Sequence, residues 1–533
     1  MRDASYSLQA AARARSGLRR LVPAEPRKAG LVMRRCLRVS LIATSLVAAA
    51  SAKAQDQGSD QLLPRLGMSP GEPLVPSAAP SLPFGIHPAE SKELVLDFHG
   101  YLLMPMEMGV HERLDPAPGQ SGTVLHTPPV IPQYIRGFEY TGVVPNPWGQ
   151  LNFTYGNSIV SATTILAAGT FSSVQSWYDT TNQLGVYDAF LNVNLSKAVG
   201  IPFQATVGAI TGRYGAMGAY DAGRYGTPLI ARTNMVGEAL TAAYPAGKWR
   251  FLLEQGFGGQ LASPPVGLVP AGWNGFVNPT VGATFVNHLH GGLAYDRVLQ
   301  VGLHYLTAWS QDDQRPNGLI PDGRITVVGA DAHVSGRLGH LFLGIAHTQL
   351  INAGGVSGAL EVLNAKGGGP DLIAGYLGPS SNGNGGLTTF GFQYDLSLSR
   401  ALFGKRYTGE SPDLLVSVFG IGTSVSSSDP NFDGVLKLKG GIEATYNVLS
   451  WLGVSERFDH VRLNSSDDRQ AFSILSSRIL FHTGWKARNE IALQYSYFSD
   501  GINVYARTGY PPIVDPSYNP DLHVFSLIGS IWW

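Results

Sequence analysis

The chain has 533 residues, of which 44% are hydrophobic and only 14% charged, with 65 glycines and a formal net charge of zero. It holds no uninterrupted apolar run near the roughly 18 residues that a membrane helix needs, which excludes a helical membrane protein. Its single cysteine, Cys36, lies in a segment that we expect to be removed, which excludes disulfides, thiolate metal sites and a cysteine nucleophile from the mature chain.

The charge is unevenly spread along the chain. Of the 38 basic residues 11 lie in residues 1–54, against 2 of the 38 acidic ones, so the rest carries 27 basic and 36 acidic residues. An acidic mature chain does not favour nucleic-acid binding.

The N-terminal segment has the pattern of a secretory signal peptide. A basic stretch that begins at Met33 precedes an apolar run over residues 39–50, and Ala52-Lys53-Ala54 matches the cleavage pattern. We predict a cleaved signal peptide over residues 33–54 and export to the bacterial outer membrane. Residues 1–32 are interpreted as an extension ahead of the true start, with a basic targeting arm as the alternative. Residues 55–91, dense in proline, are expected to form a flexible periplasmic leader.

Residues 92–533 repeat one pattern, in which apolar and polar side chains alternate along segments of roughly ten to sixteen residues between Gly-, Asn-, Asp- and Pro-rich turns. In the last segment Phe525 and Leu527 share one face, and Ser526 and Trp532 share the other. This period of two is typical of a strand with one lipid-facing and one water-facing side. We predict an all-β fold, a transmembrane antiparallel β-barrel. A soluble β-sandwich is the alternative, because it alternates in the same way with its polar face outward.

The pattern places about 18 strands, an even number as bacterial barrels require, with 16 as the alternative. They are expected near residues 93–111, 147–157, 159–171, 185–196, 202–212, 237–246, 247–258, 280–295, 297–310, 323–336, 338–351, 386–399, 412–425, 434–447, 449–463, 470–484, 486–499 and 521–533.

Short turns and long connections alternate between these strands, as periplasmic turns and outer loops do. Short turns are predicted at residues 245–247, 336–339 and around 450, and long loops over residues 112–146, 213–236, 259–279, 352–385 and 500–520. The loop after the fifth strand mixes Arg, Asp and Tyr on a Gly-rich backbone. We expect it to fold inward and constrict the channel, because so wide a barrel is not selective without such an element. An ordinary outer loop is the alternative.

No arrangement of Ser, His and Asp indicates an enzyme, and no cofactor is expected. His288 and His290 alternate along one strand and share a face, as metal ligands can, but the sequence shows no third ligand beside them. No metal site is therefore predicted.

Two stretches at the ends of the barrel carry a family resemblance. Asp97-Phe98-His99-Gly100-Tyr101 opens the first predicted strand, and Ile531-Trp532-Trp533 closes the last. Both resemble the opening and closing motifs of maltoporin and the sugar-specific porin family of outer-membrane β-barrels. The resemblance implies a trimeric channel in which Tyr101 and Trp532 belong to a row of aromatic rings that carries sugar units.

Weaker matches extend the resemblance over the first third of the chain. They imply a further path aromatic at Trp148, followed by Gln150 where the family has a carboxylate, and a tryptophan, Trp177, that members lend to a neighbouring subunit. The polar and aromatic members of the constriction would be Arg213, Asp221, Arg224 and Tyr225. The chain departs from the family at Leu103, where the family has a pore arginine, and in lacking the cysteine pair of the first external loop.

These features predict an outer-membrane porin that lets small hydrophilic solutes, sugars by the resemblance, diffuse passively along an aromatic and polar lumen. Aromatic rings stack on the apolar faces of a pyranose, and charged and amide side chains bond its hydroxyls. Two alternatives stay open: a general or anion- and phosphate-preferring porin, and a non-channel barrel with a structural or adhesive role. The expected partners are outer-membrane lipid, two further copies of the chain and small solutes.

Overall fold

The computed structural model describes residues 94–110, 134–135, 138–139, 148–169, 183–213, 232–261, 283–296, 298–311, 323–352, 377, 379–404, 412–462, 464–466, 471–483, 489–500 and 522–532. All of them belong to one compact unit, Gly58–Trp533. The signal peptide over residues 33–54, the extension before it and the proline-rich leader lie outside the described residues and stay predictions.

The strands of the main sheet follow one another along the chain with few helices between them. They are β1 (Val95–Val110), β4 (Trp148–Gly156), β5 (Val160–Gly169), β6 (Gln183–Asn194), β7 (Phe203–Arg213), β8 (Arg232–Ala246), β9 (Trp249–Leu261), β10 (Ala283–Tyr295), β11 (Leu299–Gln311), β12 (Arg324–Gly336), β13 (Gly339–Ile351), β14 (Gly385–Ser397), β15 (Asp413–Ser427), β16 (Leu436–Leu449), β17 (Leu452–Arg462), β18 (Ala471–Thr483), β19 (Asn489–Asp500) and β20 (Leu522–Trp532). Two-residue strands β2 (Tyr134–Ile135) and β3 (Phe138–Glu139) form a separate hairpin within the predicted loop 112–146.

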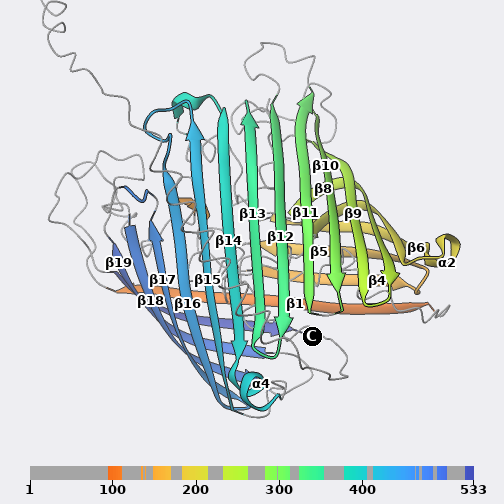
Figure 1. Ribbon diagram of the computed structural model, residues 1–533. Coiled ribbons are helices and arrows are strands. Elements are labelled where there is room, and N and C mark those ends of the chain that lie inside the picture. The colour runs from red at the N-terminus through yellow and green to blue at the C-terminus, as the bar shows by residue number, and fades with distance from the viewer. Residues whose placement is uncertain are drawn as a thin grey trace, which may run out of the picture. The chain divides into compact units, whose positions relative to one another are not determined.

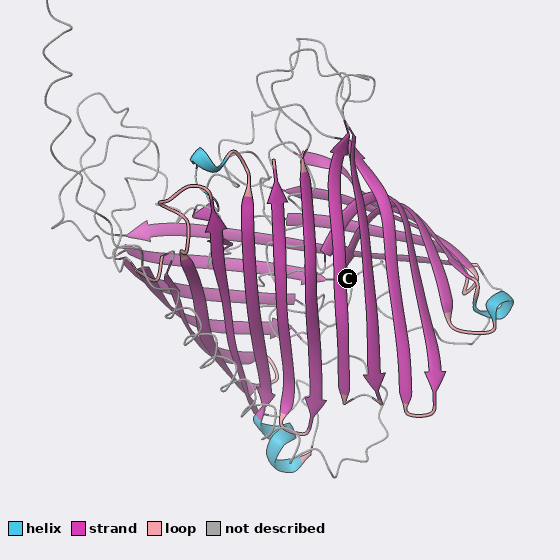
Figure 2. Cartoon of the chain, turned by 45° about the horizontal axis from the view of Figure 1, so that its top comes forward, coloured by secondary structure: helices cyan, strands magenta, loops and turns pink. Residues whose placement is uncertain are grey.

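The main sheet is closed. Each strand pairs antiparallel with its neighbours, and β1 pairs with both β4 and β20, so that 18 strands form one continuous wall. Figure 1 follows this wall in chain order, and Figure 2 shows the short helices at the strand ends. The predicted barrel of 18 strands is therefore confirmed, and each predicted segment overlaps one strand. A β-sandwich is excluded, because it would divide the strands between two open sheets.

Side chains alternate between the two faces of the wall. On β11, Leu303 is 70% exposed on the outer face, whereas its neighbour His304 is 3% exposed on the inner one. Other outward positions are also apolar and exposed, among them Leu96, Phe98, Met106, Val236, Phe251, Leu289, Val328, Ile345, Ile442, Val454, Phe458, Leu493 and Phe525. An apolar band this extensive is unusual on a soluble monomer and is expected on a barrel that lipid surrounds.

Helices contribute little to the described chain. Apart from η6 (Pro379–Ser381), they are α2 (Ser196–Val199) and α4 (Leu398–Phe403). Among the helices in this part of the chain, none has the length and apolar character needed to cross a membrane.

Helix α4, in the connection between β14 and β15, is bonded to the turn between β12 and β13 at one end of the barrel (Figure 1). It ends at Gly404, whose φ of 67° is left-handed and favours glycine. Arg337, in the turn between β12 and β13, donates from Nε to the carbonyl of Ala401 at 3.0 Å and from Nη2 to that of Leu402 at 2.8 Å. These bonds satisfy last-turn carbonyls that a helix leaves without partners.

Asp429 organises the connection between β15 and β16. Its carboxylate accepts hydrogen bonds from the backbone N–H groups of Ser380, at 3.2 Å, and Asn431, at 3.0 Å. Ser380 belongs to η6, so the carboxylate joins two connections that are far apart in the sequence. The hydrogen bonds from Ser380 and Asn431 hold the pKa of Asp429 below its ordinary value, because they favour the ionised carboxylate.

We expect Asp429 to hold η6 in place only while it is ionised. Because the pKa of Asp429 is lower in the folded state, the carboxylate stabilises the fold fully above its unfolded-state pKa of about 3.9. This stabilisation is lost as the pH falls through the lower pKa of the folded state. In Asp429→Asn, amide hydrogen exchange over residues 379–384 should therefore be faster than in the wild type at pH 7. When each rate is divided by the intrinsic exchange rate at that pH, the wild type should lose its protection only in acid. Asp433→Asn is the control, because Asp433 accepts from the N–H of Ser427 and not from η6. Unchanged exchange in Asp429→Asn would show that the carboxylate does not hold η6.

Candidate functional site

The candidate site is the inward face of the barrel, where polar and apolar side chains lie in layers. Near the long connections of β10 to β15 the inward positions are apolar, in a buried group of Val286, Leu306, Ala308, Ile325, Val327, Ala346, Leu350, Leu387 and Val425, which Leu377 joins from the connection between β13 and β14. Further along the same strands the inward positions become polar and ionisable, with His290, His304 and Asp331 each at most 5% exposed. The register between strands therefore brings inward-facing ionisable side chains together near the middle of the strands.

Three of the residues predicted to line the solute path lie directly opposite one another on adjacent strands, in one row across the sheet. Tyr101 on β1 lies directly opposite Trp532 on β20 and directly opposite Gln150 on β4. Residues directly opposite each other in antiparallel strands share a face. Tyr101 is 3% exposed and Gln150 is 2% exposed. Barrel closure thus brings the opening and closing motifs of the chain into adjacent positions.

The next row contains the fourth predicted residue. Trp148 lies opposite Leu103, and Leu103 lies opposite Ser530. Leu103 is 1% exposed and belongs to a buried apolar group with Tyr101, Leu480, Ala492 and Ile528. Leu103, which stands where the resembled family has an arginine, therefore extends an apolar patch beside Tyr101 in place of a charge.

Gln150 adds hydrogen-bonding capacity next to this patch. Its Nε2 donates to Oδ1 of Asn152 at 2.7 Å, and both side chains are 2% exposed. An amide at this position offers a donor and an acceptor without the charge of a carboxylate. The row therefore places an aromatic side chain, Tyr101, beside the neutral polar side chains of Gln150 and Asn152.

A second group on the inward face is a network of ion pairs on β16, β17 and β18. Arg457 donates from Nε to Asp459 Oδ2 at 2.6 Å and from Nη2 to Asp459 Oδ1 at 2.8 Å, a bidentate pair. Glu443 joins the network, with its Oε2 at 3.5 Å from Arg457 Nη1 and its Oε1 at 3.0 Å from Arg478 Nη1. The exposed fractions are 1% for Arg457 and 0% for Asp459.

Two lysines lie near this network on the inward face. Lys437 and Lys439 on β16 are each 3% exposed on the same face. Lys439 Nζ lies 5.9 Å from the centre of the Phe419 ring, and Arg457 Cζ lies 4.9 Å from it, within the range of cation–π attraction. Alternation predicts that the inward side of each strand faces water; these inward charges are instead buried and are held by pairing and by an aromatic face.

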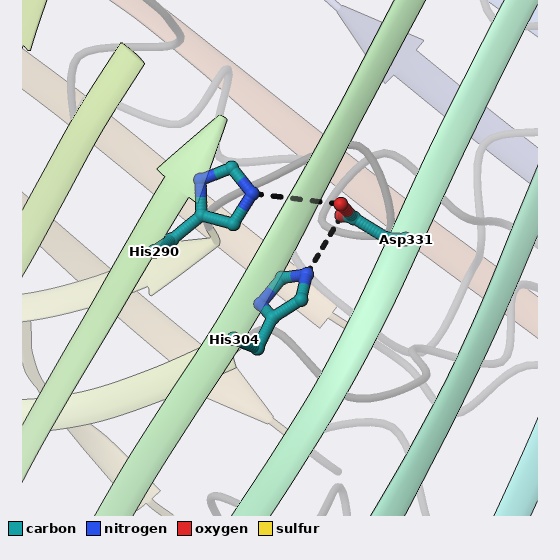
Figure 3. A group of neighbouring side chains, drawn as sticks. All are labelled: His290, His304 and Asp331. Carbon is teal, nitrogen blue, oxygen red and sulfur yellow. Dashed lines mark ion pairs between the residues drawn. The ribbon is translucent and has the colours of Figure 1, made fainter. Parts of the chain in front are cut away.

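A third group lies on β9 to β12, and Figure 3 shows three of its side chains, those of His290, His304 and Asp331. His304 Nε2 is 2.8 Å from Asp331 Oδ2, and His290 Nε2 is 3.5 Å from Asp331 Oδ1. The other ring nitrogen of His290 is 2.7 Å from Glu254 Oε2. The sequence showed only that His288 and His290 share a face; the further partners come from adjacent strands, and strand register alone places them.

The remaining predicted site residues give no side-chain geometry. Arg213 is the last residue of β7, opposite Arg232 on β8. Trp177, Asp221, Arg224 and Tyr225, with the predicted constriction loop, lie outside the described residues. Their roles stay predictions. The network around Arg457 was not predicted, although its residues alternate along strands.

Comparisons with known proteins give a likeness of overall architecture only. Neither a protein-family model nor a curated protein matches the sequence. Among solved structures, OmpT, an outer membrane protein of Vibrio cholerae, is 9% identical with a TM-score of 0.36, over 84% of this chain and 99% of that one. OccK11 (OpdR) of Pseudomonas aeruginosa is 8% identical with a TM-score of 0.38, over 82% and 95%. OccK3 (OpdO) of the same organism is 10% identical with a TM-score of 0.37, over 83% and 96%. The closed strand pairing of this chain itself establishes its fold.

Proposed function

We propose that the protein is an outer-membrane porin through which small hydrophilic solutes diffuse passively. The observation that carries this proposal is the inverted polarity of a closed sheet. The outer face exposes apolar side chains such as Leu303, and ionisable side chains such as Arg457 and Asp459 lie on the inner face. A soluble barrel has the opposite arrangement, whereas lipid requires a closed barrel with an apolar exterior. The signal-peptide pattern over residues 33–54 supports export.

Conductance of the folded barrel tests the channel. The mature chain, refolded in detergent and added to a planar lipid bilayer, should produce discrete, stepwise increases in current. Circular dichroism and resistance to unfolding in detergent would establish that the sample is folded. Folded protein that inserts without conductance would contradict the porin proposal.

Within this function we propose sugars as the preferred solutes, with Tyr101, Trp148 and Trp532 as aromatic path residues. The support is the adjacency of these positions on β20, β1 and β4, with the neutral amide of Gln150 in the same row. The constriction loop with Arg213, Asp221, Arg224 and Tyr225, the contribution of Trp177 to a neighbouring subunit and the trimer belong to the same proposal.

Blockade of the current by maltodextrins tests the sugar path. Stacking on one aromatic ring contributes about 0.5–1.5 kcal/mol, so Tyr101→Ala and Trp532→Ala should each weaken blockade about two- to tenfold. Tyr446→Ala is a matched control, because Tyr446 is 44% exposed on the outer face. Blockade by phosphate without blockade by sugars would favour an anion-preferring porin, for which Lys437, Lys439 and Arg478 offer the positive charges.

A non-conducting barrel is the second candidate, and the burial of the inward charges favours it. Asp459 and His290 are each 0% exposed and Arg457 is 1% exposed, which describes a filled interior over this part of the wall. The bilayer experiment separates the two candidates directly, since a structural or adhesive barrel gives no current.

A further inference from the structure

The group on β9 to β12 contains two histidines and two carboxylates, the types of side chain that bind metal ions in proteins. Glu254, His290 and His304 lie directly opposite one another on three consecutive strands. Asp331 lies one row away on the next strand, opposite Gly302. All four residues are on the inward face, and none is more than 6% exposed. Hydrogen bonding between the paired strands fixes the backbone positions of these four residues, so their side chains stay close together.

Gly302 gives the His290 ring room to cross strand β11. A Cβ atom at residue 302 would lie 2.0 Å from His290 Nε2 and 2.7 Å from Asp331 Oδ1, distances that real contacts do not reach. The ring therefore occupies the volume that a side chain at residue 302 would fill. This allows a histidine on β10 to meet a carboxylate on β12, two strands away, as Figure 3 shows.

The spacing of the donor atoms fits one metal ion. One ligand atom from each of His290, His304 and Asp331 can be chosen so that all lie within 4.8 Å of one another. In a tetrahedral site with metal–nitrogen and metal–oxygen distances of about 2.0–2.1 Å, ligand atoms are about 3.3 Å apart. The two rings contact different oxygens of the same carboxylate, with His290 Nε2 at 3.5 Å from Asp331 Oδ1 and His304 Nε2 at 2.8 Å from Asp331 Oδ2. Rotation of these side chains within the 4.8 Å limit would place one atom of each around one ion.

Glu254 contacts the ring nitrogen of His290 that does not face Asp331. A metal-bound histidine usually donates its other ring N–H to a carboxylate, which fixes the tautomer and orients the ring. His290 faces Asp331 with Nε2 and Glu254 with Nδ1, at 3.5 and 2.7 Å. Glu254 thus stands where a carboxylate would orient His290 toward an ion.

We propose that His290, His304 and Asp331 form a binding site for one divalent transition-metal cation, with Glu254 as the positioning residue. Two imidazoles and one carboxylate are ligands that suit zinc and its first-row neighbours, and they leave a fourth position for water or a solute. Charge balance supports the assignment, because a divalent cation neutralises the buried carboxylates of Asp331 and Glu254 while the histidines remain neutral. The proposal concerns binding alone and does not depend on conductance.

Calorimetric titration of the refolded, chelator-washed barrel with Zn²⁺ tests the site. We expect one equivalent of Zn²⁺ per chain, and Co²⁺ in its place should show the intense visible absorption of a tetrahedral site. His304→Asn should weaken Zn²⁺ binding more than 100-fold, because it removes a ligand. Glu254→Gln should weaken it about 10–100-fold, as loss of an orienting partner does. His347→Asn should leave binding unchanged, because His347 is an exposed histidine on the outer face of β13.

Gly302→Ala tests whether the position of the His290 ring, and not only the presence of the ligand side chains, is needed for binding. It keeps every ligand but places a methyl group where the His290 ring lies, so binding should weaken at least tenfold in a barrel that circular dichroism shows to be folded. Absence of stoichiometric Zn²⁺ binding by the folded wild type would overturn the proposal. So would loss of binding in His340→Asn but not in His304→Asn, since this would assign the ion to the neighbouring pair His333 and His340, whose ring nitrogens are 3.3 Å apart.

Discussion

Replacing Arg457 with methionine is expected to lower the free energy of unfolding by about 3–5 kcal/mol, the usual cost of removing one partner from a buried ion pair. The guanidinium holds Asp459 through two bonds, of 2.6 and 2.8 Å, and the Asp459 side chain is 0% exposed. Methionine would fill much of the volume beside Phe419 but would leave that carboxylate with an uncompensated charge. Equilibrium unfolding in urea of the barrel reconstituted in lipid vesicles measures the loss.

A double variant shows whether the loss comes from the stranded charge. Arg457→Met combined with Asp459→Asn removes both charges of the bidentate pair, and a well-packed neutral pair is often as stable as the ion pair it replaces. We expect the double variant to recover most of the stability lost in Arg457→Met. If the single variant loses less than about 1 kcal/mol, as exposed ion pairs do, water reaches this part of the wall and the interior is open there.

The strands could be predicted from the sequence because alternation and turn residues specify the same boundaries. A closed barrel needs every strand to have one apolar and one contrasting face, so each segment carries its own signal. The largest error is at β8, which was expected to begin at residue 237 but begins at Arg232. Residues 232–236 include Thr233 and Asn234, which are common in loops. The hydrogen-bonded ladder with β7 nevertheless continues to the pair Arg213 and Arg232.

The candidate sites were harder to predict because they depend on register between strands. Alternation showed that His290 faces inward, but not that His304 lies opposite it or that Asp331 lies one row further. A shift of one residue on either strand would turn those side chains to the outer face. The motifs at the two ends were an exception, since closure must bring β1 beside β20, and Tyr101 lies opposite Trp532.

The environment of the inward charges was predicted incompletely for a related reason. The alternation indicated a polar inner face, and water was the simplest way to solvate it. Pairing is the other way, and it requires opposite charges at matching heights on neighbouring strands. Glu443 lies directly opposite Arg457 in the ladder between β16 and β17. Such a match becomes visible only when the register of both strands is known.

The apolar outer face of the barrel leads to the second large prediction. Leu303→Arg is expected to lower the free energy of unfolding in lipid vesicles by about 2–4 kcal/mol, the cost of arginine on the lipid face of a barrel near the bilayer midplane. Leu303 is 70% exposed within β11 and lies opposite Gly291 and Ala330, so the new side chain has room and meets no steric barrier. The cost would therefore arise from moving a charge into hydrocarbon.

Leu338→Arg is the matched control, because it makes the same exchange in the two-residue turn between β12 and β13, where Leu338 is 48% exposed. An arginine there reaches water, and its effect should stay within about 0.5 kcal/mol, as for ordinary surface substitutions. The two variants change charge and volume identically, so the difference between them isolates the surroundings of residue 303. Equal, small effects would mean that water covers the apolar band, and the barrel could not then lie in a membrane with this face outward.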